Sequence, residues 1–510
     1  MRKSLCPFYI PRRRFSINLR NLNKLKAILA SFFILYTTGV GAQNLNSSYF
    51  MEGMTYRHQL NPAFMGESNY INMPLFVLGN FNVGVQGNIG VNDFLYKYNQ
   101  NGYKLTTFMN PSVSNSEFLS NLHTNNHLSM NLSMPIIAFG FRGFGGFNTF
   151  EIGFRSNTSI NLPYGLFDFM KTGMSNEAGS HYTVEDLTVR SNNYAEVALG
   201  HSHEIIKDRL TIGAKVKFLV GGANAEAKIK KMDITMGQDE WLIDAEGQLE
   251  GSLKGGYFES KEPDENGKPG EIDGFDIDGP GIGGFGVGFD LGAVYKMDDF
   301  VEGLTLSAAL LDLGFIKWNN GLKAKMIHRY TFKGFENPIA VKPDEGQPGD
   351  IDDELDNLGD QFEEFIKFRD EGTVSSRTTK LATTMNIGAE YVLPYYKNLK
   401  FGLLSSTHFN KPFTWSEARL SANVAPVRWF EASVNYAISS FGSSLGWVLN
   451  FHPNGFNFFI GTDHMITKVT PQYVPVGNAN ANVSLGFNIT WGKKKAKKVV
   501  KTTTTTISEF

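Results

Sequence analysis

The chain has 510 residues, a formal net charge of −2, 13% aromatic residues, 53 glycines and one cysteine. Few charges, many aromatic residues and abundant glycine favour a β-barrel over a two-domain soluble enzyme. A net charge close to zero argues against a protein that binds nucleic acid.

The amino terminus has the order of a secretory signal peptide. An extended basic region is followed by an apolar run at residues 27–36 and by small residues at 40–42. The run is too short to span a bilayer as a helix, so residues 1–42 are predicted to be removed after Ala42; a retained N-terminal anchor is the alternative. Cys6 lies in the removed part, so the mature chain is expected to lack disulfides and thiolate sites.

Residues 43–76 are polar, contain Pro62 and Pro74, and show no clear periodicity. They are predicted to form an N-terminal segment that folds against or inside the following domain, as a hatch does, rather than a strand. The triplet Asn61, Pro62 and Ala63 lies within this segment.

Strict alternation of apolar and polar residues marks the rest of the chain, most clearly at residues 283–318. From Phe285 to Tyr295 every second residue is apolar, whereas the residues between them as far as Gly292 are glycines and Asp290. A strand sends successive side chains to opposite faces, so one face is apolar and the other is nearly bare. An apolar exterior around a polar lumen is what a membrane-spanning barrel requires, because lipid offers no hydrogen bonds.

The alternation predicts about fourteen strands. They are expected at residues 77–90, 127–141 and 148–160, in hairpins at 192–220 and 283–318, and at 379–393, 399–408, 416–424, 428–438, 445–451, 456–463 and 482–491. Connections after even-numbered strands are short, and every long excursion follows an odd-numbered strand. This parity is typical of outer-membrane barrels with tight periplasmic turns and long outer loops. The predicted fold is therefore all-β: a transmembrane antiparallel barrel over residues 77–492 in a Gram-negative outer membrane.

Two segments depart from the strand pattern. Apolar residues three or four apart predict an amphipathic helix at residues 351–368, which either closes the barrel, docks a partner or packs on its own loop. Residues 493–510 form a basic, threonine-rich tail that is expected to be a solvated end in the periplasm.

The acidic stretches at residues 264–278 and 344–360 have the carboxylates that calcium prefers, but neither matches the twelve-residue calcium loop, so solvated outer loops are the competing interpretation. The glycine-rich run at 279–284 lacks the ending of a phosphate loop. His201 and His203 share a strand face without a third ligand and are interpreted as rim residues. No serine lies in a nucleophile elbow. We therefore predict no catalytic, cofactor or metal-binding residues and no enzyme activity.

Six charged residues should face the lumen by their strand phase, either as paired structural groups or as the lining of a permeation path. They are Glu151, Arg155, Lys215, Lys217, Asp290 and Glu390.

The triplet at 61–63, the strand ending at Tyr295 (GVGFDLGAVY) and the strand at residues 304–318 (LTLSAALLDLGFIKW) resemble the FadL-like outer-membrane barrels. The similarity is greatest to the Bacteroidota branch, which includes PorV-type proteins and a large family of unknown function. The resemblance implies a fourteen-stranded barrel whose lumen is plugged by a hatch containing Asn61, Pro62 and Ala63.

The resemblance also implies two functions. FadL-like members import long-chain fatty acids or other hydrophobic compounds, which implies passive transport of a fatty-acid-like small molecule across a lipid membrane. PorV-type members serve protein secretion, which implies a docking or scaffold component with a secretion or envelope protein as partner. No nucleic-acid partner is expected.

Overall fold

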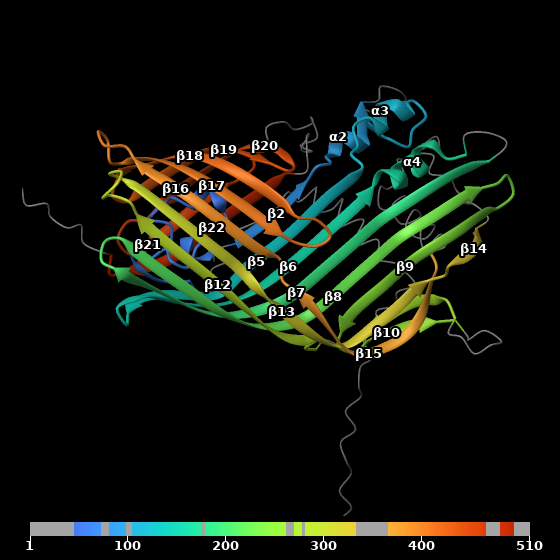
Figure 1. Cartoon of the computed structure of the whole chain (residues 1–510), viewed down its shortest axis with the longest axis horizontal. Helices are drawn as coiled ribbons and strands as arrows, with labels where there is room; N and C mark the ends of the chain where they lie inside the picture. Colours follow the sequence, from blue (N-terminus) through green and yellow to red (C-terminus); the bar gives the residue numbers. More distant parts are fainter. Residues whose placement is uncertain are drawn as a thin grey trace, which may run out of the picture.

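The computed structural model describes residues 45–72, 81–97, 105–174, 179–261, 270–277, 281–332, 366–465 and 480–493. Within these residues the main sheet closes on itself, because β1 (Asn69–Asn72) and β2 (Phe81–Gly87) each pair with both β5 and β22. The result is an antiparallel barrel with fourteen strand positions (Figure 1), which confirms the predicted fold class.

The other thirteen positions follow one another in chain order around the wall. They are β5 (Asn125–Gly143), β6 (Gly146–Pro163), β7 (Ser180–Ile206), β8 (Leu210–Met236), β12 (Gly284–Lys296), β13 (Leu304–Met326), β16 (Thr383–Val392), β17 (Leu399–Phe409), β18 (Trp415–Val427), β19 (Phe430–Ser439), β20 (Gly442–Phe451), β21 (Phe456–Thr462) and β22 (Ala481–Trp491).

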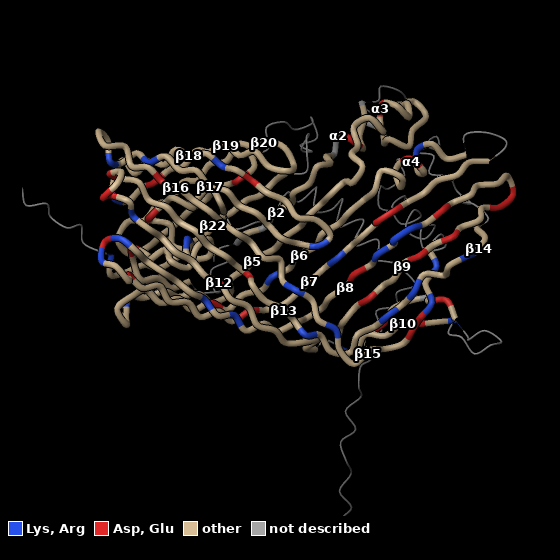
Figure 2. The backbone as a smooth tube through the Cα atoms, viewed as in Figure 1, with Lys and Arg blue, Asp and Glu red and all other residues tan. Residues whose placement is uncertain are grey.

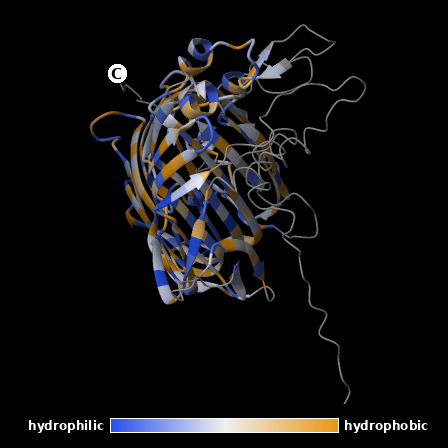
Figure 3. Ribbon diagram, turned by 90° about the vertical axis from the view of Figure 1, so that its right-hand side faces the viewer, coloured by the Kyte–Doolittle hydropathy of each residue, from blue (hydrophilic) through white to orange (hydrophobic). Residues whose placement is uncertain are grey.

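An apolar belt surrounds the wall because alternate side chains point outward. On β12, Phe285 is 58% and Leu291 52% exposed, whereas Asp290 between them is 1% exposed and points inward. The same alternation of hydrophobic and hydrophilic residues runs along the strands in Figure 3. From Phe285 to Tyr295 the strand runs about 34 Å, which at a tilt of about 40° crosses about 26 Å and matches the apolar band of an outer-membrane barrel. The chain is therefore an outer-membrane protein.

The sheet continues beyond the membrane on one side of the barrel. β7 and β8 have 27 residues each, β9 (Trp241–Leu253) enters between β8 and β13, and β14 (Arg329–Phe332) and β15 (Phe368–Lys380) complete this outer extension. The alternation in the sequence predicts that residues 161–189 and 221–281 are long excursions between strands. Much of both segments is strand instead.

The outer extension has the opposite polarity to the wall, because water rather than lipid surrounds it. Its outward face carries ion pairs such as Lys230 with Glu246 (2.5 Å) and Lys231 with Asp233 (2.6 Å), and charged residues gather there in Figure 2. Its inward face buries apolar residues, including Ile234 and Ile243, under helix α4 (Tyr164–Thr172).

Short elements complete the outer end. They are α2 (Val91–Phe94), β3 (Leu95–Lys97), β4 (Leu105–Thr107), α3 (Asn115–Leu119), and the hairpin of β10 (Gly256–Ser260) and β11 (Ile272–Ile277). Ser114 caps α3 by accepting a hydrogen bond from the backbone of Glu117. No helix in the described part of the chain has the length and apolar character needed to cross a membrane.

Several predicted segments lie outside the described residues. These are the signal peptide, the acidic stretch at 344–360 and the tail beyond Lys493. Of the predicted helix at 351–368 only the last three residues are described, and Phe368 begins β15. Of the acidic stretch at 264–278, residues 270–277 are described and mostly form β11.

A lysine in the apolar belt should destabilise the barrel. We expect Leu291→Lys to lower the free energy of unfolding in lipid vesicles by about 2–4 kcal/mol, because its ammonium group would lie near the bilayer midplane. Leu242→Lys is the matched control, since Leu242 is 44% exposed on the outer extension and should change stability by less than about 0.5 kcal/mol. Equal losses in denaturant titrations of both variants would contradict the assigned belt.

Candidate functional site

Residues 45–66, called the plug here, lie inside the barrel near the short-turn end (blue in Figure 1). They include two short 3₁₀ helices, η1 (Asn46–Ser48) and η2 (Arg57–Gln59). Residues 69–72, which the sequence analysis included in the N-terminal segment, form wall strand β1. The chain therefore passes from the lumen into the wall within a few residues.

The start of the plug is fixed to the wall by a buried carboxylate. Asp463 accepts hydrogen bonds from the backbone N–H groups of Asn46 (2.9 Å) and Ser47 (2.6 Å), which are free at the beginning of η1. Asp463 also lies 3.6 Å from Arg419, whose guanidinium pairs with Glu417 at 2.9 Å. All three charged side chains are almost fully buried.

The end of the plug is fixed to the opposite group of strands. Gln59 donates a hydrogen bond to Glu151 (2.8 Å), and Glu151 pairs with Lys215 (2.9 Å). Nε2 of His58 lies 2.7 Å from the hydroxyl of Tyr70. Burial lowers the pKa of His58 to about 3, so the imidazole is neutral in the docked plug.

The triplet at 61–63 seats the plug against β12 and β13. Oδ1 of Asn61 accepts a hydrogen bond from the backbone of Ala63 (2.9 Å), and Nδ2 donates to the carbonyl groups of Ala293 (3.3 Å) and Ala308 (3.2 Å). Asn61 thus bonds to backbone groups of two wall strands while it holds the turn of the plug closed.

Glycines in the wall make room for this triplet. Gly213 of β8 and Gly292 of β12 are directly paired, and both face the plug. A Cβ atom at Gly292 would overlap with Asn61 and lie 2.9 Å from Cδ of Pro62, and one at Gly213 would overlap with the carbonyl group of Pro62. The nearly bare face of β12 that the sequence shows is therefore, at this point, a seat for the plug.

Glycines on other strands leave space for the plug in the same way. A Cβ atom at Gly402 of β17 would overlap with the ring of Phe50, and one at Gly388 of β16 would lie 2.7 Å from Tyr49. At Gly446 of β20 it would lie 2.7 Å from Oγ of Ser47. Glycines on separate strands thus let the backbone of the wall approach the plug closely.

The structure brings five of the six predicted lumen-facing residues into neighbouring ion-pair clusters. Glu151 pairs with Lys215, as described above. Arg155 lies between Glu196 (2.9 Å) and Asp312 (3.5 Å), and Lys217 between Asp290 (2.8 Å) and Asp312 (2.5 Å). Glu390 stands apart on β16, 3.4 Å from Lys400.

Sequence reasoning missed several charged residues that form ion pairs inside the barrel. Glu417 and Arg419 are two apart on a predicted strand, so their phase was a usable signal. Asp312 offered no such signal, because the register between β12 and β13 shifts near it and its φ is +58°.

His201 and His203 stack near the rim, where His201 lies 2.9 Å from Asn148. Among the described residues no group of three metal-ligating side chains occurs.

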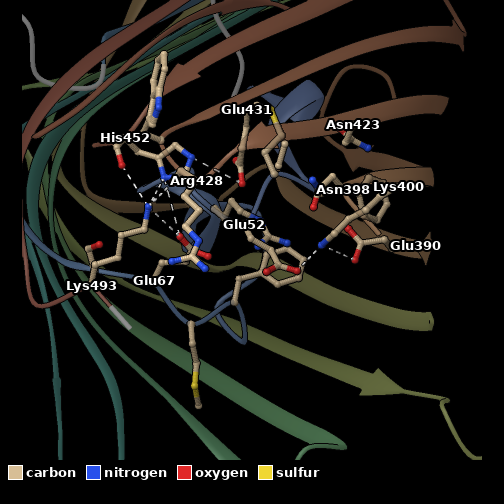
Figure 4. Close-up of a pocket in the computed structure, with 18 of the residues that line it drawn as sticks. Glu52, Glu67, Glu390, Asn398, Lys400, Asn423, Arg428, Glu431, His452 and Lys493 are labelled. Carbon is tan, nitrogen blue, oxygen red and sulfur yellow. Dashed lines mark hydrogen bonds and ion pairs between the residues drawn. The ribbon is translucent and has the colours of Figure 1, made fainter. Parts of the chain in front are cut away.

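A cavity of about 1600 Å³, called the vestibule here, opens between the plug and the short turns. The plug contributes Phe50, Met51 and Phe64 to its lining. Figure 4 shows charged residues around it: Lys400 with Glu390 on one side, and Lys493 with His452 near Glu67 on the other.

An ion pair anchors the plug at the vestibule. Glu52 pairs with Lys400, whose charge lowers the pKa of that carboxyl group to about 2. Glu431 accepts the backbone N–H of Gly53 at 3.0 Å. The plug therefore presents apolar side chains to the cavity beside the charged residues Glu52 and Arg57, and Glu52 and Gly53 also bind the wall.

A smaller cavity of about 120 Å³, called the inner pocket here, is lined by Asn46 and Leu60 of the plug and by wall residues that do not line the vestibule. Its apolar surface comes from Leu60, Leu132, Tyr194, Leu311, Leu381 and Ala382. The other twelve lining residues are polar or charged and include Arg155, Asp312 and His408. Tyr194 and Leu381 belong to a buried apolar cluster with Leu219, Ile316 and Trp318.

A sequence model described as "Family of unknown function (DUF5723)" matches residues 62–463. No curated protein matches.

Solved structures similar to this one include the toluene transporter TbuX of Ralstonia pickettii (9% identity, TM-score 0.37, covering 89% of this chain and 99% of that one). They also include the toluene transporter TodX of P. putida (9%, 0.33, 84% and 90%) and a FadL homologue of Pseudomonas aeruginosa (11%, 0.32, 89% and 98%).

A methyl group added at Gly292, where the wall contacts the triplet at 61–63, should weaken the binding of the plug to the wall. We expect Gly292→Ala to lower the free energy of unfolding in vesicles by about 1–3 kcal/mol, the usual cost of overpacking. Gly251→Ala is the control, because its Cβ would meet only a carbonyl oxygen at 3.4 Å. A parent-like denaturation midpoint for Gly292→Ala would show that the seat is not needed.

Acid should weaken the plug through His58. The pKa of His58 is about 3 in the docked state and about 6.5 in the unfolded chain, so the unfolded state binds the extra proton between these values. Stability contributed by neutral His58 is therefore present above pH 6.5 and declines as the pH falls.

Between pH 7 and 5 we expect the unfolding free energy of the parent to fall by at most about 1.4 kcal/mol per pH unit more than that of His58→Gln. Denaturant titrations at several pH values measure the difference. Identical pH profiles for the two proteins would rule out this role of His58.

Proposed function

We propose that this chain, which belongs to the family of unknown function DUF5723, lets small hydrophobic molecules pass passively across the outer membrane. The observation that carries the proposal is a pair of partly apolar cavities, the vestibule and the inner pocket, which are both lined by the plug. Neither the proposed passage nor its alternative below requires catalysis.

The plug joins the two cavities through an apolar core. Leu60 lines the inner pocket, Phe50 and Phe64 line the vestibule, and all three pack in one buried cluster with Tyr49 and Leu404. A small shift of this cluster would connect the cavities along an apolar surface. Passage is therefore a matter of local plug movement, and the barrel wall stays closed.

The inner pocket limits the size of its occupant. Its volume of about 120 Å³ is close to that of apolar cavities of about 150 Å³ that hold a benzene ring. Six apolar residues line the pocket beside a larger number of polar ones, so its lining is more polar than is usual for a small-molecule site. A compact hydrophobic molecule fits without rearrangement, whereas an extended fatty-acid-like chain requires the plug to move further.

Filling the inner pocket should slow passage. We expect Ala382→Phe to reduce the uptake of toluene into vesicles about tenfold or more, as loss of an apolar subsite does. Leu420→Phe is the control, because Leu420 is exposed on the outer surface of the wall and its replacement should leave uptake unchanged. Unchanged uptake by Ala382→Phe in a folded barrel would contradict passage through the pocket.

A docking role for a secretion or envelope protein is the alternative. The outer extension favours it, because β7, β8 and β9 form a continuous sheet with a charged outward face beyond the membrane. Membership of the Bacteroidota branch with PorV-type proteins, which the sequence resembles, would support the same role. A docking component requires a stoichiometric protein partner, whereas a passive channel does not.

A further inference from the structure

Two lysines at the outer part of the wall point away from the barrel. Trp318 of β13 and Thr379 of β15 face inward and share a hydrogen bond of 2.8 Å. Because side chains alternate along a strand, their neighbours Lys317 and Lys380 point outward, and both are exposed. Neither lysine is part of the plug, of the vestibule or of the inner ion pairs, and Lys380 borders the inner pocket.

Both lysines lie at the upper edge of the apolar belt. Lys317 is directly opposite Phe285 of β12, and Lys380 is directly opposite Phe315 of β13. Both phenylalanines are exposed to the outside. The next outward pair along these strands is Asn319 with Ser376, which is polar. The two lysines therefore occupy the first polar row above the hydrocarbon, at the depth of lipid headgroups.

Neither Lys317 nor Lys380 forms an ion pair with any residue that the structure describes. Lysines further out on β8 and β13 do have carboxylate partners: Lys228, Lys230, Lys231, Lys323 and Lys325. The neighbours of Lys317 and Lys380 on the same face are aromatic or neutral polar residues. An uncompensated pair of cations at a membrane surface attracts anionic headgroups.

We propose that Lys317 and Lys380 bind the phosphate group of an outer-leaflet glycolipid. The lysines are diagonal neighbours on adjacent strands, about 7–8 Å apart at the backbone, so two flexible ammonium groups can reach one phosphate. Phe285 and Phe315 below them would contact the acyl chains of the same lipid. A free phosphate ion would use the lysines but gain nothing from these rings, which is why a lipid is the expected occupant.

The test uses the full barrel in detergent and native mass spectrometry with diphosphorylated lipid A as the probe. We expect the double variant Lys317→Gln/Lys380→Gln to bind the lipid about 25-fold more weakly than the parent, from about fivefold for each lysine at a membrane surface. Lys317→Arg/Lys380→Arg should keep most of the binding, because the charge is retained.

Lys230→Gln/Lys231→Gln is the matched control, since these exposed lysines are paired and lie beyond the membrane, and it should bind like the parent. Heat-modifiable gel mobility verifies that each variant is folded. Parent-like binding by Lys317→Gln/Lys380→Gln would overturn the proposal, as would equal affinity of the parent for lipid A without phosphate. Displacement of lipid A by an equal concentration of inorganic phosphate would overturn the assignment to a lipid.

Discussion

Hydrocarbon offers no partner to a backbone N–H or C=O group, so a sheet that crosses it must have no free edge. This chain closes its sheet with two short strands, because β1 and β2 together fill the position between β5 and β22. Closure fixes which face of each strand meets lipid, and therefore which residues must be apolar. It also creates an interior that the remaining chain has to fill.

The plug fills that interior at one end of the barrel. Its two ends bind buried carboxylates on different parts of the wall, Asp463 near β21 and Glu151 on β6. Each carboxylate is itself paired, with Arg419 and Lys215 respectively. Removal of one member of a buried pair costs about 3–5 kcal/mol, so the plug ends are firmly held. Its apolar middle, which separates the two cavities, is held by the more exposed ion pair of Glu52 with Lys400 and by the hydrogen bonds of Asn61.

The number of strands could be predicted from the sequence because alternation is local. At β12 the contrast between Phe285 or Leu291 and the glycines is visible in the printed sequence. The length of β7 and β8 could not be predicted in the same way. Beyond the membrane the apolar face of these strands turns inward and the charged face turns outward. Charged residues such as Lys230 and Lys231 do not fit the pattern of a strand that faces lipid, so the pattern predicts a loop there.

The site itself depends on contacts between distant parts of the chain. Strand phase places Glu151, Lys215 and Lys217 in the lumen, but it does not show that Asp312 joins them, because the register shifts at that point. The sequence around Gly213 and Gly292 does not indicate that these glycines contact residues 61–63. The need for glycine becomes evident only when the plug is seen against the wall.

Passage of a small hydrophobic molecule through the plugged barrel can be tested on the protein as it is isolated from cells. The most direct measurement is mass spectrometry of everything that co-purifies with the protein when it is extracted from outer membranes in mild detergent. If the barrel is a passive channel, we expect an apolar small molecule and no stoichiometric polypeptide. A stoichiometric polypeptide with no small molecule would contradict this expectation and identify the barrel as a docking platform.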